Sequence, residues 1–455
     1  MANSYLNRNI TSSGNAKTWT WSYWVKRAKL GSWMNTHNLG GTANRDYGAF
    51  DSSNRLEFAH YNSGYQYRFL TNRVFRDVSA WYHIVIAMDT TQSTESNRTK
   101  IYVNGVQETS FNTATYPSQN QNTRGSQDKI MVGADFDPGN YFDGYQSHVA
   151  FVDGQALAPT VFGETDSTSG IWKFKSPSGV TWGTNGFHLK FENSGNLGLD
   201  SSGNSNTFSV NGNGRQALDT PSNVFATLNS LDMYYGNSTL SNGNNTQNQS
   251  ASSGNYAFIP STLGFSSGKW YWEMKCVSGH SDNWYGTGIT SSSCTADNNW
   301  LGQNANDYSM YGYSYGGGLG SSYTGGARTN QGLSFTAGDI IGVAVDCDNL
   351  AIYFSKNGTW MSTASSVQGV PTSGSSKTGS FFTITAPSST SLGFYFPAVC
   401  YFDAQNAVQN VNFGNGYFGT TAITSAGSNG NGSLFEYDVP SGYYALNTKN
   451  INTYG

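Results

Sequence analysis

The chain has 455 residues, which exceeds the roughly 250 to 300 residues at which single hydrophobic cores stop growing, so we expect two or three domains. With 11% charged residues and a net charge of -4, it offers no basic surface that would gather nucleic acid. No stretch approaches the roughly 18 consecutive apolar residues of a membrane-spanning helix, so no membrane insertion is expected.

The first half of the sequence predicts a series of antiparallel strands. Aromatic residues make up 15% of the chain, and in the run 18–26 they alternate with smaller side chains, as in a strand packed between two layers. Asn, Ser or Gly separate the short runs that follow, which is typical of a meander. We expect strands within 46–50, 56–61, 65–70, 81–89, 100–107 with a turn at Asn104-Gly105, 129–136, 141–157 and 187–195.

Residues 196–253 are dominated by Asn, Gly and Ser and contain few apolar anchors, which predicts an irregular connector. Strand patterns resume at 269–277, and 339–360 predicts further strands with a turn at Asn357-Gly358. The predicted organisation is therefore a first domain at 1–195, the connector, and a second domain with a C-terminal tail at 254–455.

Two resemblances sharpen the fold class. The segments TWTWSYWVK, WYHIVIAMDTT, KIYVNGV and FDGYQSHVAFVDGQAL occur in the order found in LamG or concanavalin A-like jelly-roll domains, and the first domain resembles them. The segments KWYWEMK, GVAVDCDNLAIYFSKNGTW and FYFPAVCYFDAQNAVQNVNFG resemble a SPRY domain over roughly Tyr256 to Phe418. Both resemblances imply antiparallel β-sandwiches, so we expect an all-β protein of two such sandwiches.

A third resemblance concerns function. The segments 4–27, 191–208, 218–232 and 440–451 resemble structural proteins of marine tailed bacteriophages. This implies a virion component such as a tail fibre, capsid fibre or knob, assembled in the host cytoplasm, homo-oligomeric, with other virion proteins and a host-surface glycan as partners. A secreted lectin-like carbohydrate-binding protein, a glycan depolymerase and an intracellular SPRY-type adaptor are the alternatives.

The titratable residues predict no enzyme and no required cofactor. Glucanases of the jelly-roll fold place two glutamates and an aspartate close together on one strand, whereas no two glutamates of the first half are closer than 13 positions. The histidines are scattered without metal-binding spacing, and we expect isolated structural roles. They are His37, His60, His83, His148, His188 and His280. The cysteines are also widely spaced, and we expect buried free thiols, with one disulfide as the alternative. They are Cys276, Cys294, Cys347 and Cys400.

Two sets of residues are candidate sites. Aromatic residues in Gly-rich stretches of the second domain are candidates for glycan or partner contact from loops, with packing against a neighbouring subunit as the alternative. They are Trp284, Tyr285, Trp300, Tyr308, Tyr311, Tyr313, Tyr315 and Tyr323. The LamG resemblance implies a calcium ion at the sheet rim, for which Asp135, Asp137 and Asp143 are candidate ligands, although aspartate is also a common turn residue.

Overall fold

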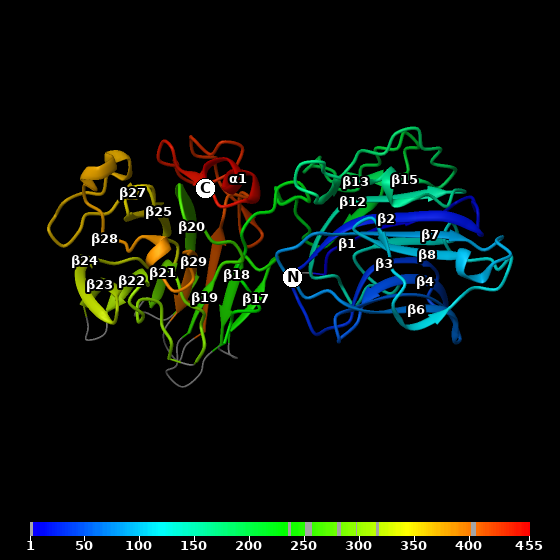
Figure 1. Cartoon of the computed structure of the whole chain (residues 1–455), viewed down its shortest axis with the longest axis horizontal. Coiled ribbons are helices and arrows are strands. Elements are labelled where there is room, and N and C mark those ends of the chain that lie inside the picture. Colours follow the sequence, from blue (N-terminus) through cyan, green and yellow to red (C-terminus); the bar gives the residue numbers. More distant parts are fainter. Residues whose placement is uncertain are drawn as a thin grey trace. The chain divides into compact units, whose positions relative to one another are not determined.

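A computed structural model describes residues 3–234, 238–250, 257–279, 284–296, 298–314, 318–401 and 406–455. The chain forms two compact units, the first from residues 1–216 with 220–222 and the second from 217–219 with 223–455 (Figure 1). Both are built from β-strands, which confirms the all-β class, and the described α-helix is α1 (Thr448–Tyr454). Among the described residues, no helix is long and apolar enough to cross a membrane.

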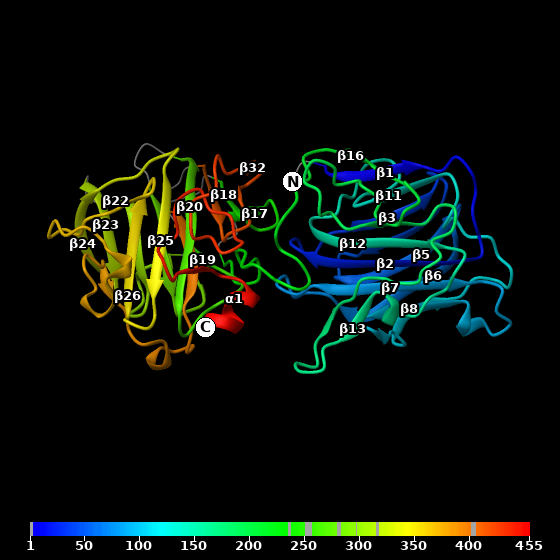
Figure 2. The same ribbon diagram turned by 90° about the horizontal axis from the view of Figure 1, so that it is seen from above.

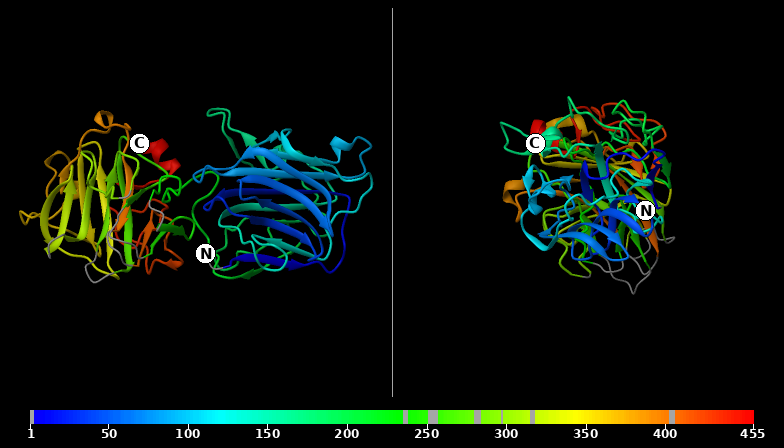
Figure 3. Two further views of the ribbon diagram at one scale, coloured as in Figure 1. Left: turned by 90° about the horizontal axis from the view of Figure 1, so that it is seen from below. Right: turned by 90° about the vertical axis from the view of Figure 1, so that its right-hand side faces the viewer.

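The first unit is a sandwich of two antiparallel sheets. The larger sheet contains β1 (Tyr5–Asn9), β3 (Met34–Gly40), β4 (Asn44–Phe50), β5 (Arg55–Asn62), β6 (Tyr65–Val74), β10 (Phe111–Thr115), β11 (Lys129–Val132) and β16 (Ser209–Asn211). The smaller contains β2 (Thr18–Arg27), β7 (Tyr82–Asp89), β8 (Thr99–Val103), β9 (Val106–Gln107), β12 (Gly144–Asp153) and β15 (Phe187–Leu189). Their strand orders are β10-β6-β5-β4-β3-β11-β1-β16 and β15-β12-β2-β7-β8-β9, and Figure 3 shows the two layers.

The core of the first unit lies between these sheets. Because side chains alternate along a strand, β2 turns Trp19, Trp21 and Tyr23 toward the larger sheet, and each ring is at most 1% exposed. Trp19 meets Phe58 of β5 edge-on, with ring centroids 6.0 Å apart. Large aromatic rings thus fill a core whose aliphatic content is modest, as the composition predicts.

The second unit is a second sandwich of antiparallel sheets (Figure 2). One sheet contains β17 (Ser238–Ser241), β18 (Thr246–Gln249), β20 (Lys269–Ser278), β25 (Ile340–Asp346), β26 (Ala351–Lys356), β27 (Thr359–Trp360), β28 (Phe382–Thr383), β30 (Ala407–Asn412) and β33 (Tyr444–Ala445). The other contains β19 (Ala257–Pro260), β21 (Tyr285–Thr290), β22 (Tyr308–Ser314), β23 (Gly318–Thr324), β24 (Ala327–Leu333) and β29 (Phe396–Tyr401). The short strand β33 is the exception in direction, because it pairs with β20 in parallel.

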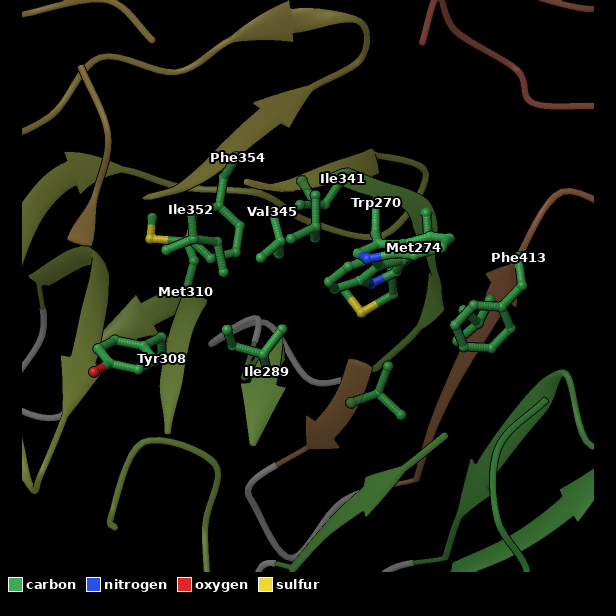
Figure 4. Packing of buried hydrophobic residues seen from close by; sticks show 14 of the residues in the cluster. Trp270, Met274, Ile289, Tyr308, Met310, Ile341, Val345, Ile352, Phe354 and Phe413 are labelled. Atoms are coloured by element: carbon green, nitrogen blue, oxygen red, sulfur yellow. The ribbon is translucent and has the colours of Figure 1, made fainter. Parts of the chain in front are cut away.

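Alternating residues of β20 and β25 face the core of the second unit. Trp270 and Met274 of β20 lie beside Ile341 and Val345 of β25, and Met310 approaches from the opposite sheet (Figure 4). These side chains are fully buried. The four cysteines are buried as well, with free thiols.

The structure differs from the predicted organisation in the stretch 196–253. The first unit extends past residue 195, because β16 pairs with β1 at its sheet edge. Further along, β17 and β18 form a hairpin that joins the second unit through β30, so these parts of the stretch belong to the two sandwiches, while 196–208 and 212–234 form no regular strand. Its Asn, Gln, Ser and Thr side chains bond to one another, as where Thr246 donates to Asn410 at 2.6 Å, and this satisfies polar groups that lie in the sheet. The units divide instead near residues 217–222.

Two short pairings remain. The hairpin of β13 (Gly163–Thr165) and β14 (Trp172–Phe174) belongs to the first unit, and β31 (Tyr417–Phe418) with β32 (Thr421–Ala422) belongs to the second. The segment 154–186, which contains the β13–β14 hairpin, packs on the outer face of the smaller sheet of the first unit. Its contacts there include Phe162 and Trp182 with Val85 and Val152.

Candidate functional site

The aromatic candidates of the second unit do not all lie in loops. Tyr308, Tyr311 and Tyr313 belong to β22, Tyr323 belongs to β23 and Tyr285 begins β21, so the expected loop position of these five residues is wrong. Tyr285, Tyr308 and Tyr311 are at most 5% exposed. Glycine makes room for these rings. Gly286 pairs with Tyr311 across the ladder, and a Cβ there would lie 2.4 Å from the Tyr311 ring.

The other described candidates form two aromatic pairs. Trp284 and Tyr313 meet edge-on with ring centroids 4.9 Å apart, and Trp300 and Tyr323 do so at 5.0 Å. These four side chains are half-buried. Tyr315 lies outside the described residues. The aromatic candidates therefore divide between the core and two local pairs, and a role for those pairs in binding stays a prediction.

The three aspartates expected to hold calcium are not gathered into one site. Asp135 accepts hydrogen bonds from the Asn38 amide at 2.9 Å and from the Phe136 backbone N–H at 2.8 Å. Burial raises the pKa of Asp143, which indicates a carboxyl group poorly compensated by charge. Among the described residues, no group of three or more His, Cys, Asp or Glu side chains has the arrangement to hold a metal ion.

A surface that the sequence reasoning missed lies on the outer face of the larger sheet of the first unit. Directly paired residues share a face, and the ladders place Arg45 opposite Tyr61, and Tyr61 opposite Tyr65. Arg68 shares this face, because it lies opposite Ala59, which in turn lies opposite Tyr47. We call the set Arg45, Tyr61, Tyr65 and Arg68 the outer-face platform.

The platform is a pair of phenol rings with a guanidinium group on each side. The Tyr61 and Tyr65 rings meet edge-on at 5.7 Å, the Arg45 guanidinium lies 5.5 Å from the Tyr61 ring, and that of Arg68 lies 4.5 Å from the Tyr65 ring. Tyr61 is 36% exposed and Tyr65 is 48% exposed. Solvent therefore reaches both rings, and cation–π contact holds each beside a cation.

Buried polar groups support the platform from below. Glu57 is fully buried and accepts hydrogen bonds from the Tyr47 hydroxyl at 2.7 Å and from Arg68 at 2.8 Å. Burial, with the adjoining Glu57 charge, raises the pKa of Tyr47, so this hydroxyl stays protonated and keeps donating. Asp135 lies 3.6 Å from the Arg45 guanidinium. Each cation of the platform thus has its own carboxylate, and the face is electrically balanced.

The sequence contained part of this information. The runs 46–50, 56–61 and 65–70 were recognisable as strands of a meander. Which side chains share a face depends on the register, however, and β-bulges shift the β5–β6 register between Arg55 and Glu57 and again between His60 and Tyr61.

Two protein-family models match the chain. The concanavalin A-like lectin/glucanases superfamily matches residues 2–161, and the SPRY domain matches residues 269–415. The chain carries a concanavalin A-like domain followed by a SPRY domain. Each match falls within one unit of the structure, and domains of these kinds are associated with binding and protein interaction.

Solved structures similar to the chain include SPRY domains. The SPRY domain of human HERC1 is 18% identical, with 38% of this chain and 91% of that chain covered and a TM-score of 0.27. The TRIM65 PSpry domain is 11% identical, with 41% and 88% covered and a TM-score of 0.28. Stonustoxin is 18% identical, with 41% and 27% covered and a TM-score of 0.27. No curated protein matches the chain.

Proposed function

We propose that the chain is a non-catalytic binding protein that holds carbohydrate on the outer-face platform. The observation that carries this proposal is the pair of exposed rings, Tyr61 and Tyr65, flanked by Arg45 and Arg68 on one sheet face. Aromatic rings offer apolar faces to the C–H groups of a sugar, and guanidinium N–H groups donate to its hydroxyls. The SPRY domain provides a second surface for a protein partner.

The setting of Glu57 supports binding without cleavage. Glycoside hydrolysis requires two carboxyl groups about 5 to 9.5 Å apart, of which at least one must reach the scissile bond. Glu57 is fully buried, and its two oxygens are taken by Tyr47 and Arg68. Its position suits a support for the platform rather than an acid or nucleophile.

Tyr65→Ala tests the platform, with Tyr234→Ala as a matched control because Tyr234 is a similarly exposed tyrosine (55%) of the second unit. We expect polysaccharide binding, measured by calorimetry against a panel of purified glycans, to weaken at least about tenfold in Tyr65→Ala, or about 1.4 kcal/mol, and to persist in the control. Equal affinity of the two variants would remove the platform assignment. Release of reducing ends from a bound glycan would contradict the non-catalytic role.

The aromatic pairs of the second unit are the second contact that we propose. Trp284→Ala and Tyr313→Ala should each weaken attachment to the host surface, because each removes one ring of an edge-on pair. If the variants instead change the oligomeric state in light scattering and leave attachment unchanged, the pair packs between subunits.

We further propose that the protein is a homo-oligomeric virion component, assembled in the host cytoplasm with other virion proteins. The support is the resemblance of segments 4–27, 191–208, 218–232 and 440–451 to phage structural proteins. Mass spectrometry of purified particles should find the chain in fixed copy number with the other structural proteins. Its absence from particles, or a stable monomer at high concentration, would contradict this assignment and would favour a secreted lectin-like protein.

A further inference from the structure

The β13–β14 hairpin of the first unit is held against the smaller sheet by histidines. In Figure 1 the hairpin lies on the side of β12 and β2 that faces away from β3 and β4. Its tip is exposed, with Ile171 at 66%, whereas Trp172 and Phe174 on β14 are half-buried. These two rings rest on His83 of β7 and His148 of β12.

The contact at His83 requires a neutral imidazole. The Trp172 indole donates to His83 Nδ1 at 2.9 Å, so this nitrogen carries no proton. The other nitrogen, Nε2, lies 2.9 Å from the Ser22 hydroxyl and carries the ring's single proton. A second proton, on Nδ1, would place the imidazole N–H against the Trp172 indole N–H, and the hydrogen bond would be lost. The His83 ring also stacks on Trp24, with centroids 4.7 Å apart, and lies edge to edge with Trp172, whose ring centroid is 6.0 Å away in a nearly parallel plane.

Glycines shape the place where Trp172 lies. A Cβ added at Gly105 or at Gly163 would come within 2.5 Å of the Trp172 ring. Gly105 has φ of +80° in the β8–β9 turn, and Gly163 pairs with Phe174 in the hairpin itself. The close fit directs the indole N–H toward His83.

The contact at His148 also depends on neutral rings. His148 lies in the β-bulge of β12 with φ of +47°, and its ring stacks on Phe174 with centroids 3.5 Å apart. Its Nδ1 lies 3.4 Å from Nε2 of His188, a separation at which the two nitrogens can share one proton. If both rings were protonated, two like charges would lie side by side beneath the hairpin.

The surrounding charges oppose protonation more than they favour it. Lys190 repels a proton on His148 and on His188, and Asp200 attracts one only at His188. His148 likewise repels a proton on His83. On the hairpin, Lys173 is exposed and paired with Asp166 at 3.0 Å and with Glu164 at 3.6 Å.

Burial dominates the protonation of all three rings. It lowers the pKa of His83 and of His148 to about 3 and that of His188 to about 4, from an ordinary value near 6.5. The hairpin contacts thus depend on His83 and His148, which remain uncharged at neutral pH together with the neighbouring His188.

We propose that the β13–β14 hairpin is an acid-sensitive latch, which lies closed on His83 and His148 at neutral pH and is released when these rings take up protons. Its release uncovers the His83 and His148 rings, on which Trp172 and Phe174 of the hairpin lie. An imidazole freed by opening takes up a proton below pH 6.5. Each freed imidazole therefore lowers the equilibrium constant for closure about tenfold for every pH unit below 6.5. With two rings freed, closure weakens about a hundredfold at pH 5.5.

Hydrogen exchange of the full chain, read by mass spectrometry and corrected for the intrinsic pH dependence of exchange, tests the latch. We expect protection of peptides within 163–174 to fall about a hundredfold between pH 7.5 and 5.5 and to return on neutralisation. Peptides of β2, a core strand of the same unit that contains none of these histidines, serve as the control. Undiminished protection of the hairpin at pH 4.5 would overturn the proposal.

Two variants distinguish release of the hairpin from a general loss of stability at acid pH. In His83→Gln with His148→Gln, a glutamine amide can still accept from Trp172 and donate to Ser22 but takes up no proton, so we expect protection that hardly changes with pH. Trp172→Ala should be open at both pH values. Acid opening of the double variant equal to that of the natural chain would overturn the proposal, and protection of β2 peptides shows whether each variant is folded.

Discussion

Glu273 offers the sharpest test of the electrostatics of the second unit. This carboxyl group of β20 is fully buried and accepts hydrogen bonds from the backbone N–H groups of Glu436 and Tyr437, both at 2.9 Å. The Tyr271 hydroxyl and the Asn412 amide also donate to it, at 3.2 and 3.3 Å. Burial raises its pKa to about 7, and the hydrogen bonds offset only part of that effect.

The raised pKa fixes the sign of the effect on stability. The folded unit holds the Glu273 proton more tightly than the unfolded chain does, so the stabilisation is complete below pH 4.5 and is lost as pH rises toward 7. The difference between the two pKa values corresponds to about 3 kcal/mol, most of which is lost between pH 5 and 8. For a unit of this size, that lowers the melting temperature by about 5 to 10 °C.

Differential scanning calorimetry of the full chain and of Glu273→Gln measures this effect. The variant cannot titrate at this position. At pH 5 we expect it to be less stable than the natural chain, because the glutamine amide N–H meets one of the backbone N–H groups. This difference in stability should shrink as pH rises to 8, because only the natural chain loses the stabilisation from the Glu273 proton. The endotherm that moves identifies the second unit. Equal pH dependence of the natural chain and the variant would refute the reasoning, because the carboxyl group would then titrate alike in the folded and unfolded states.

Three other substitutions or treatments have defined outcomes. Gly105→Ala should destabilise the first unit by about 1 to 3 kcal/mol in calorimetry, because its Cβ would clash with Trp172 and its φ is positive. Tyr67→Phe should cost about 1 to 3 kcal/mol in the same assay, since the buried Asp46 carboxylate loses the Tyr67 hydroxyl at 2.6 Å and keeps its bonds with His60 and Arg124. Thiol reagents should label the chain at neutral pH only after it unfolds, because burial raises the pKa of every thiol. The thiols are those of Cys276, Cys294, Cys347 and Cys400.

Much of the fold could be predicted from local patterns. The alternation of Trp19, Trp21 and Tyr23 marks a core-facing strand because the side-chain period of a strand is two residues. The Asn104-Gly105 and Asn357-Gly358 turns are confirmed as well, since all four residues have positive φ. Signals of this kind lie within a few residues, so no knowledge of pairing is needed to recognise them.

The candidate sites depend on pairing and were harder to predict. Tyr311 looks like a loop residue because its neighbours are Gly and Ser, and only the ladder to Gly286 reveals that a glycine leaves space for its ring. Similarly, Gln247 and Gln409 look like solvent-exposed side chains, but they bond to each other inside a sheet. Low apolar content therefore led to the prediction of a connector where edge strands form.

The parallel strand β33 has a consequence for synthesis of the chain. The first residues of the second unit form hydrogen bonds with its last residues. Ala226 donates its backbone N–H to the Leu446 carbonyl, and the Val224 carbonyl accepts the N–H of Thr448. Tyr444 also completes the pairing of Trp270. During translation the first unit can fold once residue 222 has emerged, whereas the second stays open until almost all of its own residues are made. The nascent second unit therefore exposes aromatic strands for many residues of elongation.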